Sequence, residues 1–159
     1  MRRFIVIASL SLLALVAIAA VGVSRFSLTA LDEPGQAETY LATQAKRMLV
    51  SRDSREVPPE PVSTPASIAA GEKLYGVECA SCHGLNGRTP TDAGRWMYPR
   101  AADLTSQQVQ QYSDRELFWI VKNGIRFSGM PAFGKVETDE HIWQLVHYVR
   151  SLKPSTTPR

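Results

Sequence analysis

Cysteine is scarce in this sequence: only Cys79 and Cys82 occur among its 159 residues. No second Cys/His pair completes the four-ligand set that a structural zinc site needs, so a zinc module is disfavoured. Lys and Arg form no cluster, and the charges between residues 67 and 154 nearly balance. The sequence therefore gives no sign of a nucleic-acid partner.

Strand patterns, internal repeats and substrate-site motifs are also missing. We find no persuasive alternation of apolar and polar residues, which leaves an all-α domain as the predicted fold class. No Ser/His/Asp constellation, phosphate-binding loop or pair of carboxylates stands out. The sequence therefore predicts no small-molecule substrate site and no enzymatic activity.

A long uncharged run is present at the N-terminus, where residues 4–23 follow Arg2 and Arg3. As a helix, about 20 residues span about 30 Å, the thickness of a bilayer core. Because positive residues stay on the cytoplasmic side, we expect the rest of the chain to be exported to the periplasm or another extracytoplasmic space. Two interpretations are open: a retained membrane anchor, or a signal peptide cleaved near Ala17–Ala19 that leaves a soluble protein. The run exceeds the roughly 7–15 residues of a signal-peptide core, which favours the anchor.

After this first segment (1–25), residues 26–66 are polar and rich in proline. One face of a short predicted helix is apolar: Leu41, Ala45, Met48 and Leu49. This stripe is thin and indicates a surface helix or a frayed segment. The prolines that follow predict an extended, semi-rigid stretch: Pro58, Pro59, Pro61 and Pro65. We expect residues 26–66 to be a tether, 67–154 a globular domain and 155–159 a tail.

Helix-capping signals recur within the predicted domain. Ser67 is placed to cap a first helix that runs to about Val77, and a short helix is predicted near 106–111. Ser113 and Glu116 have capping-box spacing for a further helix, which Gly124 is suited to end.

A last helix is predicted to begin at Thr138, where acidic residues suit its positive end, and Pro154 bars its continuation. Its apolar stripe is Ile142, Leu145, Val146, Val149 and Leu152.

The two cysteines are spaced by one helical turn, and His83 follows at once. A redox-active dithiol has this spacing but usually opens a helix in a βαβ setting and needs no histidine. A disulfide across so small a loop would constrain the unfolded chain little. Covalent haem attachment uses all three residues: Cys79 and Cys82 would form thioethers to the two vinyl groups, and His83 would bind the iron. The motif therefore predicts one haem c, which also supplies a small domain with a large apolar body.

Residues 67–153 resemble a class I c-type cytochrome. The segments GEKLYGVECASCHG and NGIRFSGMPAF and the closing amphipathic helix carry the resemblance. It implies a small all-α fold wrapped around one haem, with the first and last helices of the domain crossing closely at Gly71. Tyr75 would then pack against Trp143 or Val146.

The resemblance also implies that Met130 is the distal iron ligand, presented by an irregular Gly-Met-Pro turn. Met97 is the reserve candidate, whereas Met48 precedes the proline-rich stretch. His147 lies on the far side of the last helix from its apolar stripe, so we expect it to be a surface residue, and His141 likewise.

Four further residues are candidates for the haem pocket. Related proteins pass a loop along the proximal edge, where Pro99 is the candidate carbonyl for the second nitrogen of His83 and Arg100 the candidate partner of a propionate. Trp119 and Phe127 are candidate pocket walls.

We expect an exported, membrane-anchored carrier of single electrons between redox proteins, donor and acceptor both being respiratory partners. A thioether ligand and a buried haem both predict a moderate-to-high reduction potential. Two alternatives stay open: the electron-entry subunit of a larger dehydrogenase or oxidase, and a haem sensor or peroxidase with an open distal face.

Overall fold

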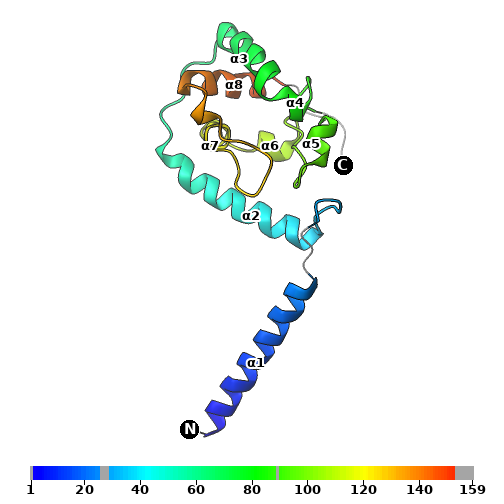
Figure 1. Cartoon of the computed structure of the whole chain (residues 1–159). Coiled ribbons are helices and arrows are strands. Elements are labelled where there is room, and N and C mark those ends of the chain that lie inside the picture. The colour runs from blue at the N-terminus through cyan, green and yellow to red at the C-terminus, as the bar shows by residue number, and fades with distance from the viewer. Residues whose placement is uncertain (1, 26–28, 89, 153–159) are drawn as a thin grey trace.

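The computed structural model describes residues 2–25, 29–88 and 90–152, and these ranges are helical with no strand (Figure 1). The elements, in chain order, are α1 (Arg2–Arg25), α2 (Gln36–Asp53), the 3₁₀ turn η1 (Ser54–Glu56), α3 (Pro65–Glu78), α4 (Ala80–His83), α5 (Asp92–Trp96), α6 (Gln107–Gln110), α7 (Asp114–Asn123), the 3₁₀ turn η2 (Phe133–Lys135) and α8 (Asp139–Ser151). The expected all-α fold is confirmed. Pro154 and the predicted tail lie outside the described residues.

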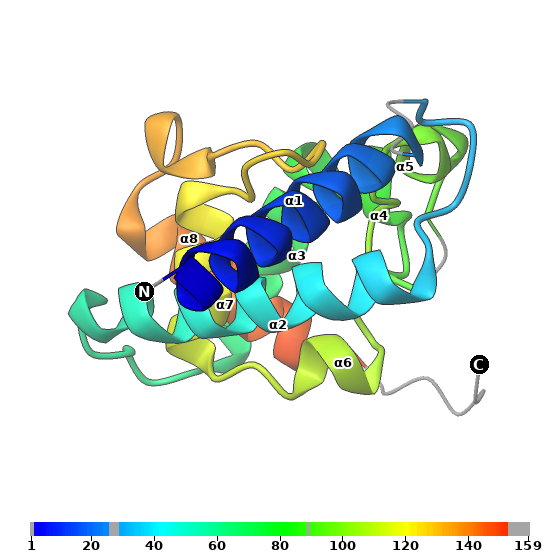
Figure 2. The ribbon, with the colours of Figure 1, turned by 90° about the horizontal axis from the view of Figure 1, so that it is seen from below.

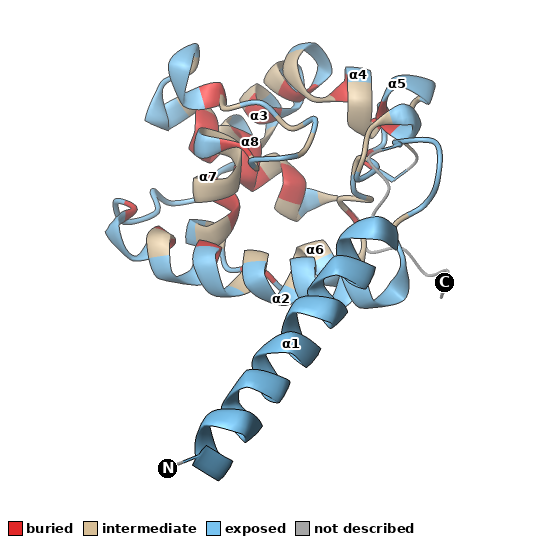
Figure 3. Cartoon of the chain, turned by 60° about the horizontal axis from the view of Figure 1, so that its bottom comes forward, coloured by how far each residue is buried: buried red, intermediate tan, exposed pale blue. Residues whose placement is uncertain are grey.

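Helix α1 contains no buried residue, and its most apolar stretch of 18 residues has a mean hydropathy of 2.9 (Figure 3). It is long and apolar enough to cross a membrane, a property that a signal sequence at an N-terminus shares. Anchor and signal peptide therefore both stay open.

Helices α3 and α8 cross closely at Gly71, as predicted. A Cβ on Gly71 would lie 1.9 Å from the carbonyl oxygen of Gln144, so only glycine permits this approach. Tyr75, one turn further along, packs with Leu145, and its ring lies 5.0 Å from that of Tyr148. The expected partners, Trp143 and Val146, belong instead to the core cluster that includes Leu117 and Phe118 of α7.

The core lies where α7 packs on α8. The rings of Phe118 and Trp143 are 4.4 Å apart, and Ile142 is fully buried beside them. Of the predicted stripe on α8, the buried members are Ile142, Leu145, Val146 and Val149, and Leu152 is half-buried.

The predicted capping signals are mostly confirmed. Ser113 and Glu116 form the capping box of α7, and Gly124 ends that helix at φ 67°. Helix α3 differs, because Thr64 rather than Ser67 caps it. The Thr64 side chain accepts from the backbone N–H of Ser67 at 3.1 Å, and Pro65 at the first helical position favours this earlier start.

Helix α2 lies across the domain on the side opposite α3 (Figures 1 and 2). Val50 and Val57 are buried in the core formed with α7 and α8. The predicted apolar face points outward: Leu41 is 65% exposed and Met48 is 68% exposed. Within the expected tether, α2 and η1 occupy residues 36–56, whereas residues 29–35 and 57–64 are free of helix.

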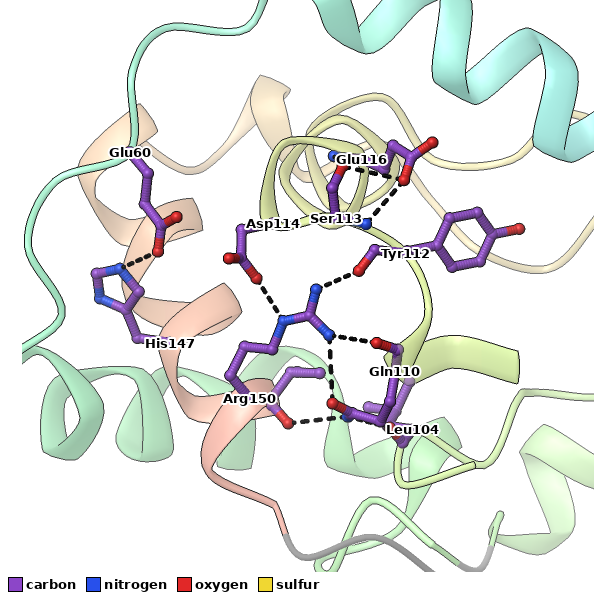
Figure 4. Close-up of polar contacts among 10 residues, drawn as sticks. Glu60, Leu104, Gln110, Tyr112, Ser113, Asp114, Glu116, His147 and Arg150 are labelled. Atoms are coloured by element: carbon purple, nitrogen blue, oxygen red, sulfur yellow. Dashed lines mark hydrogen bonds and ion pairs between the residues drawn. The ribbon is translucent and has the colours of Figure 1, made fainter. Parts of the chain in front are cut away.

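His147 is buried at 3% exposure, so the prediction of a surface residue was wrong. Its side of α8 is covered by the extended 58–64 segment and the start of α3. His147 Nδ1 lies 2.9 Å from Ser67 Oγ. Its Nε2 lies 3.3 Å from Glu60 Oε1 (Figure 4). His141, in contrast, is partly exposed and pairs with Glu137.

An arginine next to this cluster ties α8 to α6 and α7. The Arg150 guanidinium contacts the Asp114 carboxylate, the Tyr112 carbonyl and, at 2.9 Å, the Gln110 carbonyl (Figure 4). These contacts close the face of the domain that the 58–64 segment crosses.

Candidate haem-binding site

The two cysteines flank the junction of α3 and α4. Cys79 ends α3, and its carbonyl accepts from the backbone N–H groups of Cys82 at 3.1 Å and His83 at 2.9 Å. This single turn places both thiols and the imidazole on one short helical segment, which Gly84 ends at φ 75°.

Both thiols are free rather than joined in a disulfide. Burial raises the pKa of the Cys79 thiol to about 12, and the neighbouring Glu78 charge acts in the same direction. A redox-active dithiol needs a thiolate with a lowered pKa. Cys79 therefore lacks the low thiol pKa that disulfide exchange requires.

Polar contacts fix the motif against the rest of the domain. The Tyr75 hydroxyl donates to the Gly84 carbonyl at 2.6 Å in a buried position, and the Thr91 hydroxyl donates to the Ser81 carbonyl at 2.5 Å. Thr91 also caps α5, a helix that sequence analysis missed. Its Thr-Asp start is the same signal that Thr138 and Asp139 give for α8.

The imidazole of His83 is oriented by one backbone carbonyl. Its Nδ1 donates to the Ala102 carbonyl at 2.8 Å, and not to that of Pro99 as we had expected. Because Nδ1 carries the proton, Nε2 carries the lone pair that can bind a metal. Burial lowers the pKa of His83, with the Ala102 bond opposing the shift, and so favours the neutral ring.

At Gly94, the loop that supplies this carbonyl lies close to the segment of Cys79, Cys82 and His83. A Cβ there would lie 2.2 Å from the Cys82 carbonyl oxygen, and the Ala101 N–H donates to the Gly94 carbonyl at 2.9 Å. Three residues therefore set the ligand geometry without any signal in the sequence motif: Gly94, Ala101 and Ala102.

Arg100, the candidate propionate partner, is paired with Glu33 at 2.6 Å. Nearby, the Tyr98 hydroxyl donates to the Glu38 carboxylate at 2.6 Å. Both acidic residues belong to the segment before the domain, and sequence analysis missed both contacts. A propionate contact by Arg100 stays a prediction.

Met130 is half-buried in a loop that closes on itself. Gly124 has φ 67°, and a Cβ there would lie 2.7 Å from the Met130 carbonyl oxygen, so the loop returns to the end of α7. The Ile125 N–H donates to that carbonyl at 3.3 Å, and Ser128 Oγ accepts from the Met130 N–H at 3.2 Å. The loop holds Met130 outside any helix, as a ligand-bearing turn requires.

The reserve methionine lies next to this loop. A Cβ on Gly129 would lie 2.4 Å from Met97 Sδ, so the Met97 thioether packs against the residue before Met130. The structure thus brings the Met97 thioether next to the loop that carries Met130. The assignment of Met130 as the distal ligand stays a prediction.

The two candidate aromatic walls differ in position. Trp119 on α7 is partly buried and packs against the core. Phe127 belongs to the Met130 loop, is 91% exposed and has φ 62°, a left-handed conformation that is uncommon for a bulky residue. Their contact with haem stays a prediction.

The donor set fits a covalently bound haem. Two free thiols lie one turn apart, the imidazole has its lone pair at Nε2, and a thioether sits in a separate closed loop. Together with the all-α fold, this set defines the class of c-type cytochromes, whose cofactor is haem c.

Comparison with known proteins agrees with this class. Residues 66–149 match the family described as cytochrome c oxidase, cbb3-type, subunit III, and the chain belongs to this family. Cytochrome c-554(547) of Halothiobacillus neapolitanus is 43% identical over 42 residues, which are 26% of this chain and 41% of that protein.

Two solved structures are also similar. A chain of the reducing HAO-like protein complex of Kuenenia stuttgartiensis is 28% identical, with a TM-score of 0.57 over 62% of this chain and 49% of that one. The c-type cytochrome KustC0563 is 32% identical, with a TM-score of 0.47 over 52% of this chain and 96% of that one. The matches to cytochrome c-554(547) and to the HAO-like complex each cover less than half of the related chain.

Proposed function

We propose that this protein relays single electrons through one haem c that is ligated by His83 and Met130 and held on the extracytoplasmic side of a membrane by α1. When bound, haem c supplies a one-electron couple between ferric and ferrous iron. The observation that carries the proposal is the bond from His83 Nδ1 to the Ala102 carbonyl, which fixes the tautomer that a proximal ligand needs.

The chain's own residues suit electron transfer better than catalysis. The Met130 loop is closed by backbone bonds, so the thioether can stay in place in both oxidation states. A thioether opposite an imidazole raises the reduction potential and leaves no open iron face for a gas or peroxide. We therefore infer a carrier, with protein donors and acceptors and no small-molecule substrate.

The test uses the full chain, made alongside the haem-attachment machinery. Optical spectra and a redox titration should show a low-spin centre of moderate-to-high potential that retains its haem in acid solvent after denaturation. Binding of carbon monoxide to the ferrous protein at neutral pH would support the sensor or peroxidase alternative instead. Release of the haem into acid solvent would overturn covalent attachment.

Replacing Met130 with Ala tests the distal ligand. The variant should bind carbon monoxide and have a lower potential, because the iron loses its soft thioether ligand. Met97→Ala is the matched control, because Met97 packs against Gly129 of the Met130 loop. This substitution should leave the iron ligands unchanged. The opposite outcome for the two variants would assign Met97 as the ligand.

A second candidate function is the electron-entry subunit of a larger complex. The matching family is described by an oxidase subunit, and one similar structure belongs to a redox complex. Extraction in mild detergent separates the two: a carrier migrates alone, whereas a subunit copurifies with its partner chains.

A further inference from the structure

Helix α2 presents opposite faces to the domain and to solvent. Val50 is buried against the core, and the flanking Thr43, Lys46 and Arg47 are half-buried. Leu41 and Met48 lie about 160–180° round the helix from Val50 and point outward. The result is an apolar ridge on the exposed side of a helix that is already anchored on its other side.

Polar contacts fix this orientation, so rotation cannot bury the ridge. The Arg47 guanidinium donates to the Gln108 carbonyl at 3.2 Å and lies 5.0 Å from the centre of the Tyr112 ring. At the other end of α2, Glu38 accepts from Tyr98. The ridge is consequently a permanent feature of the surface.

The ridge consists of Leu41, Ala45 and Met48, which lie within about 60° of one another around the helix. Tyr40 and Leu49 are also exposed, but they lie on opposite flanks of the ridge. Beyond Met48, the outward face ends at Arg52, whose side chain is 64% exposed. Exposed apolar side chains beside a basic residue can enter a membrane interface, with the apolar groups toward the lipid chains and the charge at the headgroups.

The short connection between α1 and α2 indicates that the ridge faces the membrane. Only residues 26–35 separate Arg25, at the end of α1, from Gln36, at the start of α2. Fully extended, ten residues span at most about 35 Å, so an α1 that crosses the bilayer keeps α2 close to its surface. Leu31, in this connection, is 94% exposed.

We propose that α2 lies flat on the membrane surface with its Leu41–Met48 ridge in the headgroup region, an inference that rests on the anchor role of α1 in the proposed function. A helix held near the bilayer gains from a high effective concentration, so a short ridge suffices for docking. The docked helix fixes the orientation of the haem domain, with α3 on the side away from the bilayer (Figure 1).

The test places a nitroxide spin label on the ridge of the full-length protein in vesicles of phosphatidylethanolamine and phosphatidylglycerol. Met48→Cys carries the label, and Val77→Cys is the matched control, since Val77 is 75% exposed on α3 across the domain. Native Cys79 and Cys82 are consumed by covalent haem, so the unsubstituted protein should take no label.

The label at position 48 should collide more often with dissolved oxygen and less often with a water-soluble nickel chelate than the label at position 77. Equal collision rates at both positions would overturn the inference. Fewer collisions with both reagents would also overturn it, because that pattern indicates cover by a second copy of the chain.

The proposed function fails in visibly different ways. Labelling of the unsubstituted protein would mean that the thiols are not bound to haem. Protein that does not float with the vesicles would mean that α1 is not an anchor. A third outcome is distinct from both: the protein floats and carries haem, but the label at position 48 still collides freely with the nickel chelate. That outcome would contradict only the docking of α2.

Discussion

Helices α8 and α2 both carry an apolar stripe in their sequence, but only α8 buries it. Ile142 and Val146 of α8 are almost fully buried, whereas Leu41 and Met48 of α2 are mostly exposed. The stripe of α8 meets aromatic and aliphatic side chains of α7, so burial removes a large apolar area from water. Helix α2 is held instead by Val50 and by polar contacts on its other face.

The difference shows that helical periodicity identifies a face but not what covers it. On α2 the side that packs is partly charged, and burial lowers the pKa of Lys46 there, with the neighbouring Arg47 charge as a second cause. Helix α2 thus packs partly charged side chains against the domain and leaves Leu41 and Met48 exposed. This arrangement is consistent with a second apolar environment outside the domain.

The largest expected effect comes from the crossing that positions α8. In Gly71→Val the side chain would meet the Gln144 carbonyl, so α3 and α8 must separate and we expect a loss of at least about 3 kcal/mol or failure to fold. Guanidinium unfolding followed by circular dichroism measures it. Gly76→Ala is the control on the same helix, because a Cβ at Gly76 meets nothing within 4 Å. This control should stabilise the protein by about 0.5–1 kcal/mol. Equal stabilities of the two variants would show that the helices do not cross this closely.

The comparison of stripes can be tested by truncating one member of each. Ile142→Ala removes a side chain with 0% exposure and should cost about 2–5 kcal/mol of unfolding free energy. Met48→Ala, at 68% exposure, should change the unfolding free energy in detergent by less than about 0.5 kcal/mol. A large loss in Met48→Ala would mean that the ridge packs against protein.

Two neighbouring residues sharpen the comparison within α2. Val50→Ala should cost about 1–2 kcal/mol because it removes two buried methyl groups from the core at 2% exposure. Leu49→Ala, next in the chain but 42% exposed, should cost less than half as much. Chemical unfolding of both variants measures the difference, and the reverse order would place the other face of α2 against the domain.

Local signals predicted much of the fold. The capping box at Ser113 and Glu116, the glycine at 124 and the Thr138 cap are readable because each works through contacts a few residues apart. The motif of Cys79, Cys82 and His83 is equally local, and its role in haem attachment stays a prediction.

Contacts between distant segments were not readable. The carbonyl that orients His83 belongs to Ala102, and a backbone acceptor leaves no mark on residue type. His147 was taken for a surface residue because helical geometry gives its side of α8 but not the presence of Glu60 above it. Both errors arise from loops whose paths depend on tertiary packing.

The smallest expected effect concerns the 58–64 segment, which covers His147 with Glu60. Burial and the Asp114 charge raise the pKa of Glu60 above its ordinary value of 4.5, while His147 opposes the shift. Because the folded state holds the proton more tightly, the stabilisation that Glu60 provides is complete below the ordinary pKa and is lost as pH rises through the raised pKa. Glu60→Gln cannot titrate, so its unfolding free energy relative to the wild type should increase across that window and then level off.

Guanidinium unfolding at a series of pH values from about 4 to about 8 measures this difference. Glu56→Gln, on the exposed turn η1, is the control and should track the wild type. A Glu60→Gln difference that falls with rising pH would mean that the ion pair with His147 outweighs burial. The 58–64 segment would then be held to α8 by the charge pair of Glu60 and His147.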